Sequence, residues 1–184
     1  DSWSPYLPFF RGQVSNWSIK PNITRNPNLD RLGILKSESL LYSEFSKGKI
    51  KGVNVLPHFK KKDYKYAQDW HNLFQMQHLG FYTRLTDWSQ NFETALFFAI
   101  HDEEKRFEDE DGVFWIYKCP YDEPDYIINF NKTEEYDSFD LNPFKLDKFY
   151  LIKHYTQFPD NFMNYAGEMR RFRQGGSFII STTE

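Results

Sequence analysis

Near the start of the chain, an arginine follows an apolar run and precedes a glycine, in the stretch Pro8-Phe9-Phe10-Arg11-Gly12-Gln13. The planar guanidinium of arginine binds carboxylate or phosphate groups through paired hydrogen bonds. A glycine lets another molecule approach the backbone closely. Two interpretations of Arg11 therefore compete: it binds an anion, or its side chain extends to solvent at the end of a strand while Gly12 makes a turn. This stretch alone leaves both open.

A second stretch, "QMQHLGFYTRLTDW" over residues 75–88, gathers hydrogen-bonding side chains between two apolar helical segments. It brings Tyr82, Thr83, Arg84 and Asp87 close together in the sequence, as a ligand pocket would require. The competing interpretation is a buried Arg84–Asp87 ion pair, which we favour for these two residues because buried charges are usually paired. His78 has no second His or Cys at a metal-ligand spacing, so we expect no metal site.

A third stretch, "RRFRQGGSF" over residues 170–178, places three arginines beside Gln174 and two glycines. Arginines are favoured at a helix C-terminus followed by glycine, which explains Arg170 without a binding role. Gln174 is explained less well in this way, because it opens the last expected strand. The sequence contains no phosphate-binding P-loop, no nucleophile elbow and no HExxH zinc motif.

The elements that would position these stretches follow from hydrophobic periodicity and from turn residues. We expect strands over about 6–12, 81–88, 113–119, 126–130, 149–155 and 176–182. We expect helices over about 30–45, 66–77, 92–107 and within 160–174, and a loop over 18–28. Asn91 is expected to cap the third helix, whose buried face would hold five apolar side chains: Phe92, Ala95, Leu96, Ala99 and Ile100.

This order of elements predicts an α+β fold with helices in the N-terminal half packed on a mainly antiparallel sheet. The strand over 113–119 is almost entirely apolar, which predicts a central place in that sheet. A chain of 184 residues with 20% aromatic side chains suits a single domain over residues 1–184 and argues against disorder. The single cysteine, the net charge of −3 and the absence of a long apolar run predict a cytoplasmic protein that does not enter a membrane.

Together, the three stretches resemble the FRG-domain family, which is named for a Phe-Arg-Gly signature. The resemblance rests on the following pieces: Phe9-Phe10-Arg11-Gly12-Gln13 with Ser15-Asn16-Trp17, Gln77-His78-x-Gly80-x-x-Thr83-Arg84-Leu85-x-Asp87-Trp88, Ala95 to Ala99, Gly112 to Ile116, and Arg171-x-x-Gln174-x-Gly176-x-Phe178. Phe81-Tyr82, Thr86 and Phe92 depart from the usual family residues. Members of this family are similar to accessory domains of bacterial and phage conflict systems.

The chain also resembles, more weakly, the ADP-ribosyltransferases, in which a first strand ends in Arg-Gly and a last strand bears Glu or Gln. This resemblance implies a split sheet and NAD⁺ as the substrate. The residues that it implies for NAD⁺ binding are Arg11, Gly12, Gln13, Tyr82, Thr83 and Arg84. The residues that it implies for catalysis are Asp87 and Gln174. Because Gln174 is neutral, a carboxylate must come from Glu38, Asp87 or Glu168, among which we select Asp87.

Two functions follow as expectations. The first is an NAD⁺-consuming ADP-ribosyltransferase-like enzyme, a toxin or phage-defence effector that modifies a nucleic acid or a protein. The second is a non-catalytic module of a conflict system that binds a nucleotide or a partner. The second is favoured by the lack of an evident catalytic carboxylate. A metal-dependent nuclease is disfavoured, since the sequence shows neither a cluster of carboxylates nor a histidine pair.

Overall fold

A computed structural model describes residues 6–30, 33–48, 65–102, 105–107, 109–120, 127–129, 141–146, 149–153 and 176–181. The chain forms two compact units that interleave along the sequence. The first unit comprises residues 1–19, 87–131 and 151–179, and the second comprises residues 20–86, 132–150 and 180–184. The sheet lies mainly in the first unit, and most of the helical segments lie in the second.

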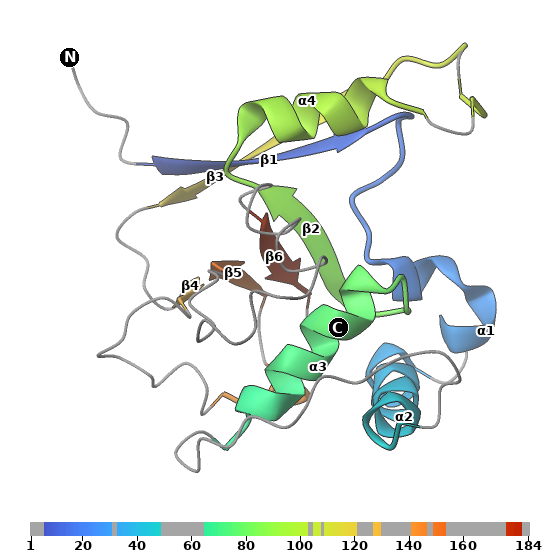
Figure 1. The fold of residues 1–184 in the computed structure, drawn as a ribbon, viewed down its shortest axis with the longest axis vertical. Coiled ribbons are helices and arrows are strands. Elements are labelled where there is room, and N and C mark those ends of the chain that lie inside the picture. The colour runs from blue at the N-terminus through green and yellow to red at the C-terminus, as the bar shows by residue number, and fades with distance from the viewer. Residues whose placement is uncertain are drawn as a thin grey trace. The chain divides into compact units, whose positions relative to one another are not determined.

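The fold is α+β, as the order of elements predicts (Figure 1). The helical segments are η1 (Asn22–Arg25), α1 (Pro27–Asp30), α2 (Ile34–Ser46), α3 (Ala67–His78) and α4 (Phe92–Ile100). The strands are β1 (Tyr6–Gln13), β2 (Leu85–Ser89), β3 (Val113–Pro120), β4 (Ile127–Asn129), β5 (Tyr150–Lys153) and β6 (Gly176–Ile180).

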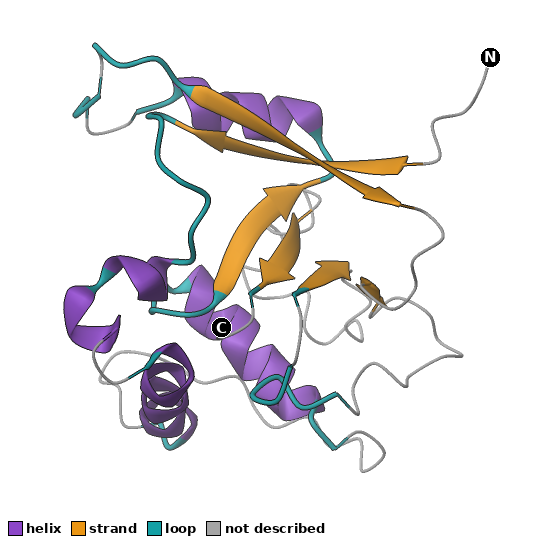
Figure 2. Ribbon diagram, turned by 180° about the vertical axis from the view of Figure 1, so that it is seen from behind, coloured by secondary structure: helices purple, strands orange, loops and turns teal. Residues whose placement is uncertain are grey.

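The described strands form one sheet in the order β3-β1-β2-β6-β5-β4 (Figure 2). Strand β1 is antiparallel to both β2 and β3, whereas β4 and β5 are parallel. Strand β3 therefore lies at the end of this order, and the expectation of a central position is wrong. Its apolar character has another cause, because α4 packs against β1 and β3 and the side chains of Trp115 and Tyr117 pack on the core around Phe9.

Helix α4 approaches β1 and β3 closely because two glycines leave room for its backbone. A Cβ atom on Gly12 would lie 1.8 Å from the carbonyl oxygen of Ala95, and one on Gly112 would lie 1.9 Å from that of Ala99. Ala95 and Ala99 are accordingly the buried residues of α4. Asn91 caps the helix as expected, with its side-chain oxygen 3.1 Å from the amide nitrogen of Thr94.

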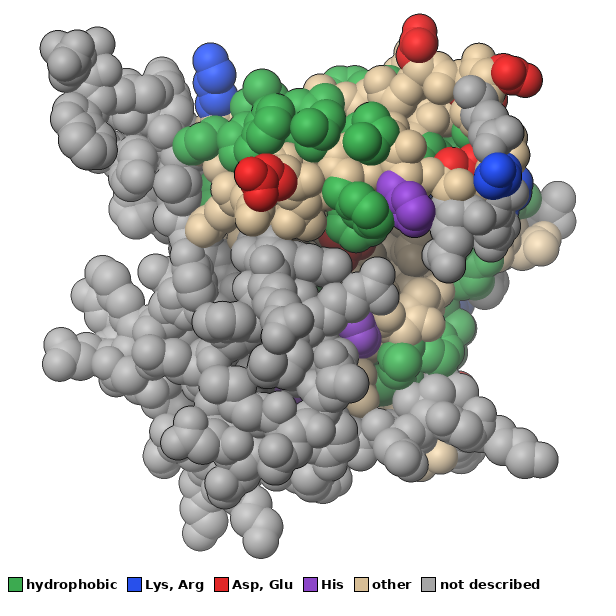
Figure 3. All heavy atoms as spheres, turned by 45° about the horizontal axis from the view of Figure 1, so that its top comes forward, with side chains coloured by type: hydrophobic (Ala, Val, Ile, Leu, Met, Phe, Trp, Pro, Cys, Tyr) green, Lys and Arg blue, Asp and Glu red, His purple; other side chains and the backbone are tan. Residues whose placement is uncertain are grey.

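The expected buried face of α4 is only partly correct. The large apolar side chains of the helix are exposed, namely Phe92, Leu96, Phe97, Phe98 and Ile100. Figure 3 shows hydrophobic side chains gathered on one face of the molecule. Because the glycines let the helix backbone approach the strands closely, the small alanines fill this contact. Phe92 also contacts the strands, through ring contacts with Phe10 and Phe114. The helix also ends at Ile100, earlier than the expected 107.

In the second unit, α2 packs against α3. The apolar side chains of α3 that the periodicity assigns to the core are buried, namely Trp70, Leu73 and Phe74. The helix ends at His78, and Gly80 follows with a φ of +79°, a conformation that glycine adopts without strain. The expected loop over 18–28 is wrong in part, since it contains η1 and the start of α1, where Pro27 occupies the first helical position.

The expected helix within 160–174 lies outside the described residues. The expectation of a single domain over 1–184 and that of a split sheet stay predictions. None of the described helices is both long and apolar enough to cross a membrane.

Candidate functional site

Arg11 lies on β1 in the first unit, where its side chain is partly buried. Its Nη1 atom donates a hydrogen bond of 2.6 Å to the backbone carbonyl oxygen of Asp87 on β2. Asp87 is the one exposed residue of that strand, whose other four residues are buried. The structure therefore brings a cation from the first motif next to a carboxylate-bearing residue from the second.

Gly12 and Gln13, which follow Arg11, lie on opposite faces of β1 because side chains alternate along a strand. The α-carbon of Gly12 faces α4, so the glycine has a structural reason in the close approach of that helix. Its role in binding a ligand stays a prediction. Gln13 is only 5% exposed, and its Oε1 atom accepts no hydrogen bond from any residue that the structure describes.

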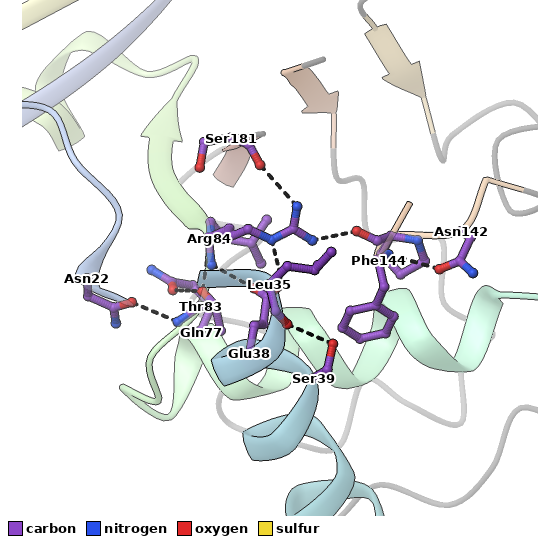
Figure 4. Close-up of polar contacts among 12 residues, drawn as sticks. Asn22, Leu35, Glu38, Ser39, Gln77, Thr83, Arg84, Asn142, Phe144 and Ser181 are labelled. Carbon is purple, nitrogen blue, oxygen red and sulfur yellow. Dashed lines mark hydrogen bonds and ion pairs between the residues drawn. The ribbon is translucent and has the colours of Figure 1, made fainter. Parts of the chain in front are cut away.

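Tyr82 and Thr83 belong to the second unit and differ in exposure. Tyr82 is 41% exposed, whereas Thr83 is fully buried. The Thr83 amide donates a hydrogen bond to Asn22 Oδ1 (2.8 Å), and its hydroxyl donates one to Gln77 Oε1 (2.5 Å), as Figure 4 shows. These contacts fix the chain just before β2, which gives Thr83 and Gln77 a structural explanation.

Arg84 is fully buried in the second unit and forms an ion pair with Glu38 of α2, which is also fully buried (Figure 4). Its Nε atom lies 2.6 Å from Glu38 Oε2, and its backbone amide donates to Glu38 Oε1 at 2.7 Å. The two remaining guanidinium nitrogens donate to the carbonyl oxygens of Ser181 (3.1 Å) and Pro143 (2.5 Å). All three side-chain nitrogens thus have acceptors, as a buried charge requires.

The structure therefore confirms that Arg84 forms a buried ion pair. The predicted partner is wrong, because Arg84 pairs with Glu38 and not with Asp87. Arg84 is fully buried, whereas Asp87 is exposed, and the two side chains do not pair. The use of Arg84 for NAD⁺ binding stays a prediction, although its nitrogens are already engaged. Glu38 is also poorly suited to face a ligand, since it is fully buried and both of its oxygens accept hydrogen bonds from Arg84.

Sequence reasoning considered Glu38 only as a candidate catalytic carboxylate and gave Trp115 no role of its own, but the structure makes both residues prominent. Glu38 occupies the buried side of α2 together with Phe45, and a charged residue in such a face was the available signal for a buried ion pair. Trp115 on β3 pairs directly with Arg11. Its Nε1 atom is buried and donates to no acceptor within the described part of the chain. Only the register of β1 and β3 could show that this indole lies beside Arg11.

The predicted site residues thus fall into separate groups. Arg11, Gly12, Gln13 and Asp87 lie in the first unit, where Arg11 and Asp87 are in contact. Tyr82, Thr83 and Arg84 lie in the second unit. Gln174 and Glu168 lie outside the described residues. Among the side chains that are described, no group of three or more His, Cys, Asp or Glu residues could hold a metal ion.

Comparison with known proteins gives one match. The family model of the FRG domain matches residues 7–108, which is more than half of the 184-residue chain. The chain belongs to the FRG-domain family. The match includes the stretches around Arg11 and Arg84, whereas the stretch around Gln174 falls outside it. No curated protein and no solved structure matches the chain.

Proposed function

We propose that this FRG-domain chain binds NAD⁺ and consumes it as an ADP-ribosyltransferase-like enzyme. The observation that supports the proposal is the contact between Arg11 and Asp87, two residues separated by 76 positions in the sequence. The bond ends on the backbone carbonyl of Asp87, so it brings an anion-binding guanidinium to the strand position that carries an exposed carboxylate. A guanidinium suits the negatively charged pyrophosphate of NAD⁺, and a carboxylate suits the positive charge that develops on the ribose when the nicotinamide leaves.

In this proposal, the Arg11 guanidinium holds the pyrophosphate of NAD⁺. The bond between the nicotinamide nitrogen and the ribose C1′ breaks, and its electron pair leaves with nicotinamide, which becomes neutral. The Asp87 carboxylate stabilises the oxocarbenium-like centre that remains on the ribose. A nucleophile of the acceptor then forms the new bond to C1′ and loses its proton. A nucleic acid or a protein serves as this acceptor, as in a toxin or a phage-defence effector.

The alternative proposal is a module that binds a nucleotide or a partner without converting it. It is favoured by the Arg84–Glu38 ion pair, because this pair removes one of the candidate carboxylates from contact with any ligand. Under this alternative, Arg11 still binds the phosphates, but NAD⁺ is released unchanged.

Nicotinamide release separates the two proposals. The purified chain is incubated with NAD⁺ and with single-stranded nucleic acid or protein acceptors. Arg11→Ala should lower kcat/KM by about 10- to 100-fold, the effect of losing a charge-assisted hydrogen bond. Asp87→Asn should lower kcat by about 100- to 1,000-fold, the usual effect of removing a group that stabilises the transition state.

The matched control is Arg25→Ala. Arg25 is also exposed enough to meet solvent and also donates to a backbone carbonyl, that of Lys20 at 3.0 Å. This variant should release nicotinamide at the wild-type rate. Release that persists unchanged in Arg11→Ala would contradict the role of Arg11. No release from any acceptor, with NAD⁺ still raising the Tm of the folded protein, would support the binding module.

A further inference from the structure

Two buried polar atoms on one face of the β1–β3 pair lack hydrogen-bond partners among the described residues. They are the Oε1 acceptor of Gln13 and the Nε1 donor of Trp115. Buried polar groups in folded proteins nearly always have a partner, so those without one need an explanation, such as a catalytic role or a bound water or ion. One acceptor and one donor on the same face, each without a partner among the described residues, therefore need a common explanation.

The register of the two strands places these side chains together. Arg11 pairs with Trp115, and Gln13 pairs with Val113. Residues directly opposite each other in an antiparallel pair share a face, as do alternate residues of one strand. Gln13 and Trp115 are therefore diagonal neighbours on the same face as Arg11, at a usual spacing of about 7–8 Å, which long side chains span.

This face is the one turned away from α4. Helix α4 packs against Gly12, which lies on the opposite side of β1 from Gln13. The side chain of Trp115 packs on the core formed by Phe9, Trp88 and Leu151, which holds the indole ring in place. Trp115 itself is only partly buried, so part of its ring remains able to contact a flat ligand.

We propose that Gln13 and Trp115 bind the edge of a planar group that carries one hydrogen-bond donor beside one acceptor. The ligand's N–H donates to Gln13 Oε1, and its acceptor receives the Trp115 Nε1–H. This proposal rests on the proposed function for the identity of the ligand. NAD⁺ contains two such edges: the carboxamide of nicotinamide and the N1/N6 edge of adenine. Arg11, which lies opposite Trp115 in the ladder, would hold the adjoining phosphates.

Binding of two fragments distinguishes the two edges. Titration calorimetry of the intact chain with nicotinamide and, separately, with AMP is the experiment. Binding of nicotinamide alone assigns the site to the carboxamide, and binding of AMP alone assigns it to the adenine edge. The variants are Gln13→Met and Trp115→Phe, which remove the polar atom and keep most of the apolar side chain. Each variant should bind the fragment with about three- to tenfold lower affinity, the usual effect of losing one hydrogen bond.

A second measurement separates ligand binding from a structural role. Removing an acceptor that has no partner among the described residues should not lower stability, so Gln13→Met should raise the Tm by about 2–4 °C. The matched control is Trp70→Phe, because the Trp70 indole donates to the carbonyl of Leu141 at 2.9 Å. This control should lower the Tm and leave fragment affinity unchanged.

Three results would overturn the proposal. The first is that neither fragment binds the wild-type chain. The second is that Gln13→Met and Trp115→Phe bind the fragment as tightly as the wild type does, which is the result expected if ordered waters are the partners. The third is that both variants lower the Tm as Trp70→Phe does. Failure of the proposed function looks different, because fragments then bind and the variants weaken them while no nicotinamide is released from NAD⁺.

Discussion

The two arginines of the family stretches have opposite surroundings. Arg84 in the second unit is fully buried, and each nitrogen of its guanidinium donates to a carboxylate or carbonyl oxygen of that unit. Arg11 in the first unit is only partly buried and holds the backbone of Asp87, whose side chain is exposed. The resemblance to ADP-ribosyltransferases implies NAD⁺ binding for both arginines, whereas the residues around Arg84 favoured a buried ion pair.

The difference teaches how to separate a structural charge from a binding one. A buried arginine whose partners satisfy every donor stabilises the fold and offers a ligand little. Arg11 is partly exposed and lies near Gln13 and Trp115, whose buried polar atoms have no hydrogen-bond partner among the described residues, and we propose that a ligand completes this surface. The contrast predicts that changes around Arg84 alter stability, whereas changes around Arg11 alter binding.

The largest effect is expected from Arg84→Met. This change leaves the Glu38 carboxylate buried without its counter-charge, and it should cost about 3–5 kcal/mol of unfolding free energy. Urea denaturation measures this loss. The double variant Arg84→Met/Glu38→Leu should recover part of it, because no uncompensated charge remains. If the single variant does not fold, the expected result is that the double variant is soluble and folded. A double variant that loses the sum of the two single effects would contradict a coupled pair.

A smaller effect is expected from Gly12→Ala in the first unit. The new Cβ atom would lie 1.8 Å from the Ala95 carbonyl oxygen and 2.6 Å from the Ala99 nitrogen, so α4 must shift. Such overpacking usually costs about 1–3 kcal/mol. Because the clash is with backbone atoms, adding Ala95→Gly should not restore stability.

Gly33→Ala is the companion variant, since nothing lies within 4 Å of a Cβ at this position but its φ is +81°. Its loss should be about 1–3 kcal/mol, because a positive φ combined with a ψ of 136° is a backbone conformation that residues other than glycine rarely adopt. Recovery of Gly12→Ala by Ala95→Gly would show that side-chain contacts, and not the backbone of α4, limit this position.

Much of the fold could be predicted, because strong local patterns control it. The alternation and apolar runs around Phe9, Trp115 and Phe178 identified their strands, and the Asn91 cap identified the start of α4. What failed depends on contacts between distant segments. The packing of α4 through Ala95 is determined by glycines far away in the sequence, which no helical periodicity contains.

The candidate site follows the same division. Sequence motifs identified Arg11 and Arg84 as unusual, and the family assignment is confirmed. They did not identify the partner of Arg84, because Glu38 lies 46 residues upstream and becomes a neighbour only when α2 and β2 have formed. For the same reason, the closeness of Gln13 to Trp115 required the register of β1 and β3.

The smallest effect is expected at a partly buried polar cluster between α2 and α3 of the second unit. The Tyr42 hydroxyl donates a short hydrogen bond to Asp69 Oδ1 and accepts one from Asn72 Nδ2 at 3.3 Å. Burial raises the pKa of the Tyr42 hydroxyl well above its usual value, and the hydrogen bond and negative charge of Asp69 raise it further, whereas the hydrogen bond from Asn72 lowers it.

The sign of the pH dependence follows from this direction. Because the folded-state pKa of Tyr42 is raised, its contribution to stability is complete below pH 10, where the unfolded chain keeps the proton as well. Above pH 10 the unfolded chain loses the proton first, so the wild type should lose stability by up to about 1.4 kcal/mol per pH unit from this group.

Urea denaturation of wild type and Tyr42→Phe from pH 8 to pH 11 isolates the effect. The variant should be less stable by about 1 kcal/mol at pH 8, and that difference should shrink above pH 10. A stability difference between the two proteins that stays constant from pH 8 to pH 11 would contradict this prediction. It would mean that Tyr42 has the same pKa in the folded and unfolded states, so that its surroundings do not favour the protonated hydroxyl.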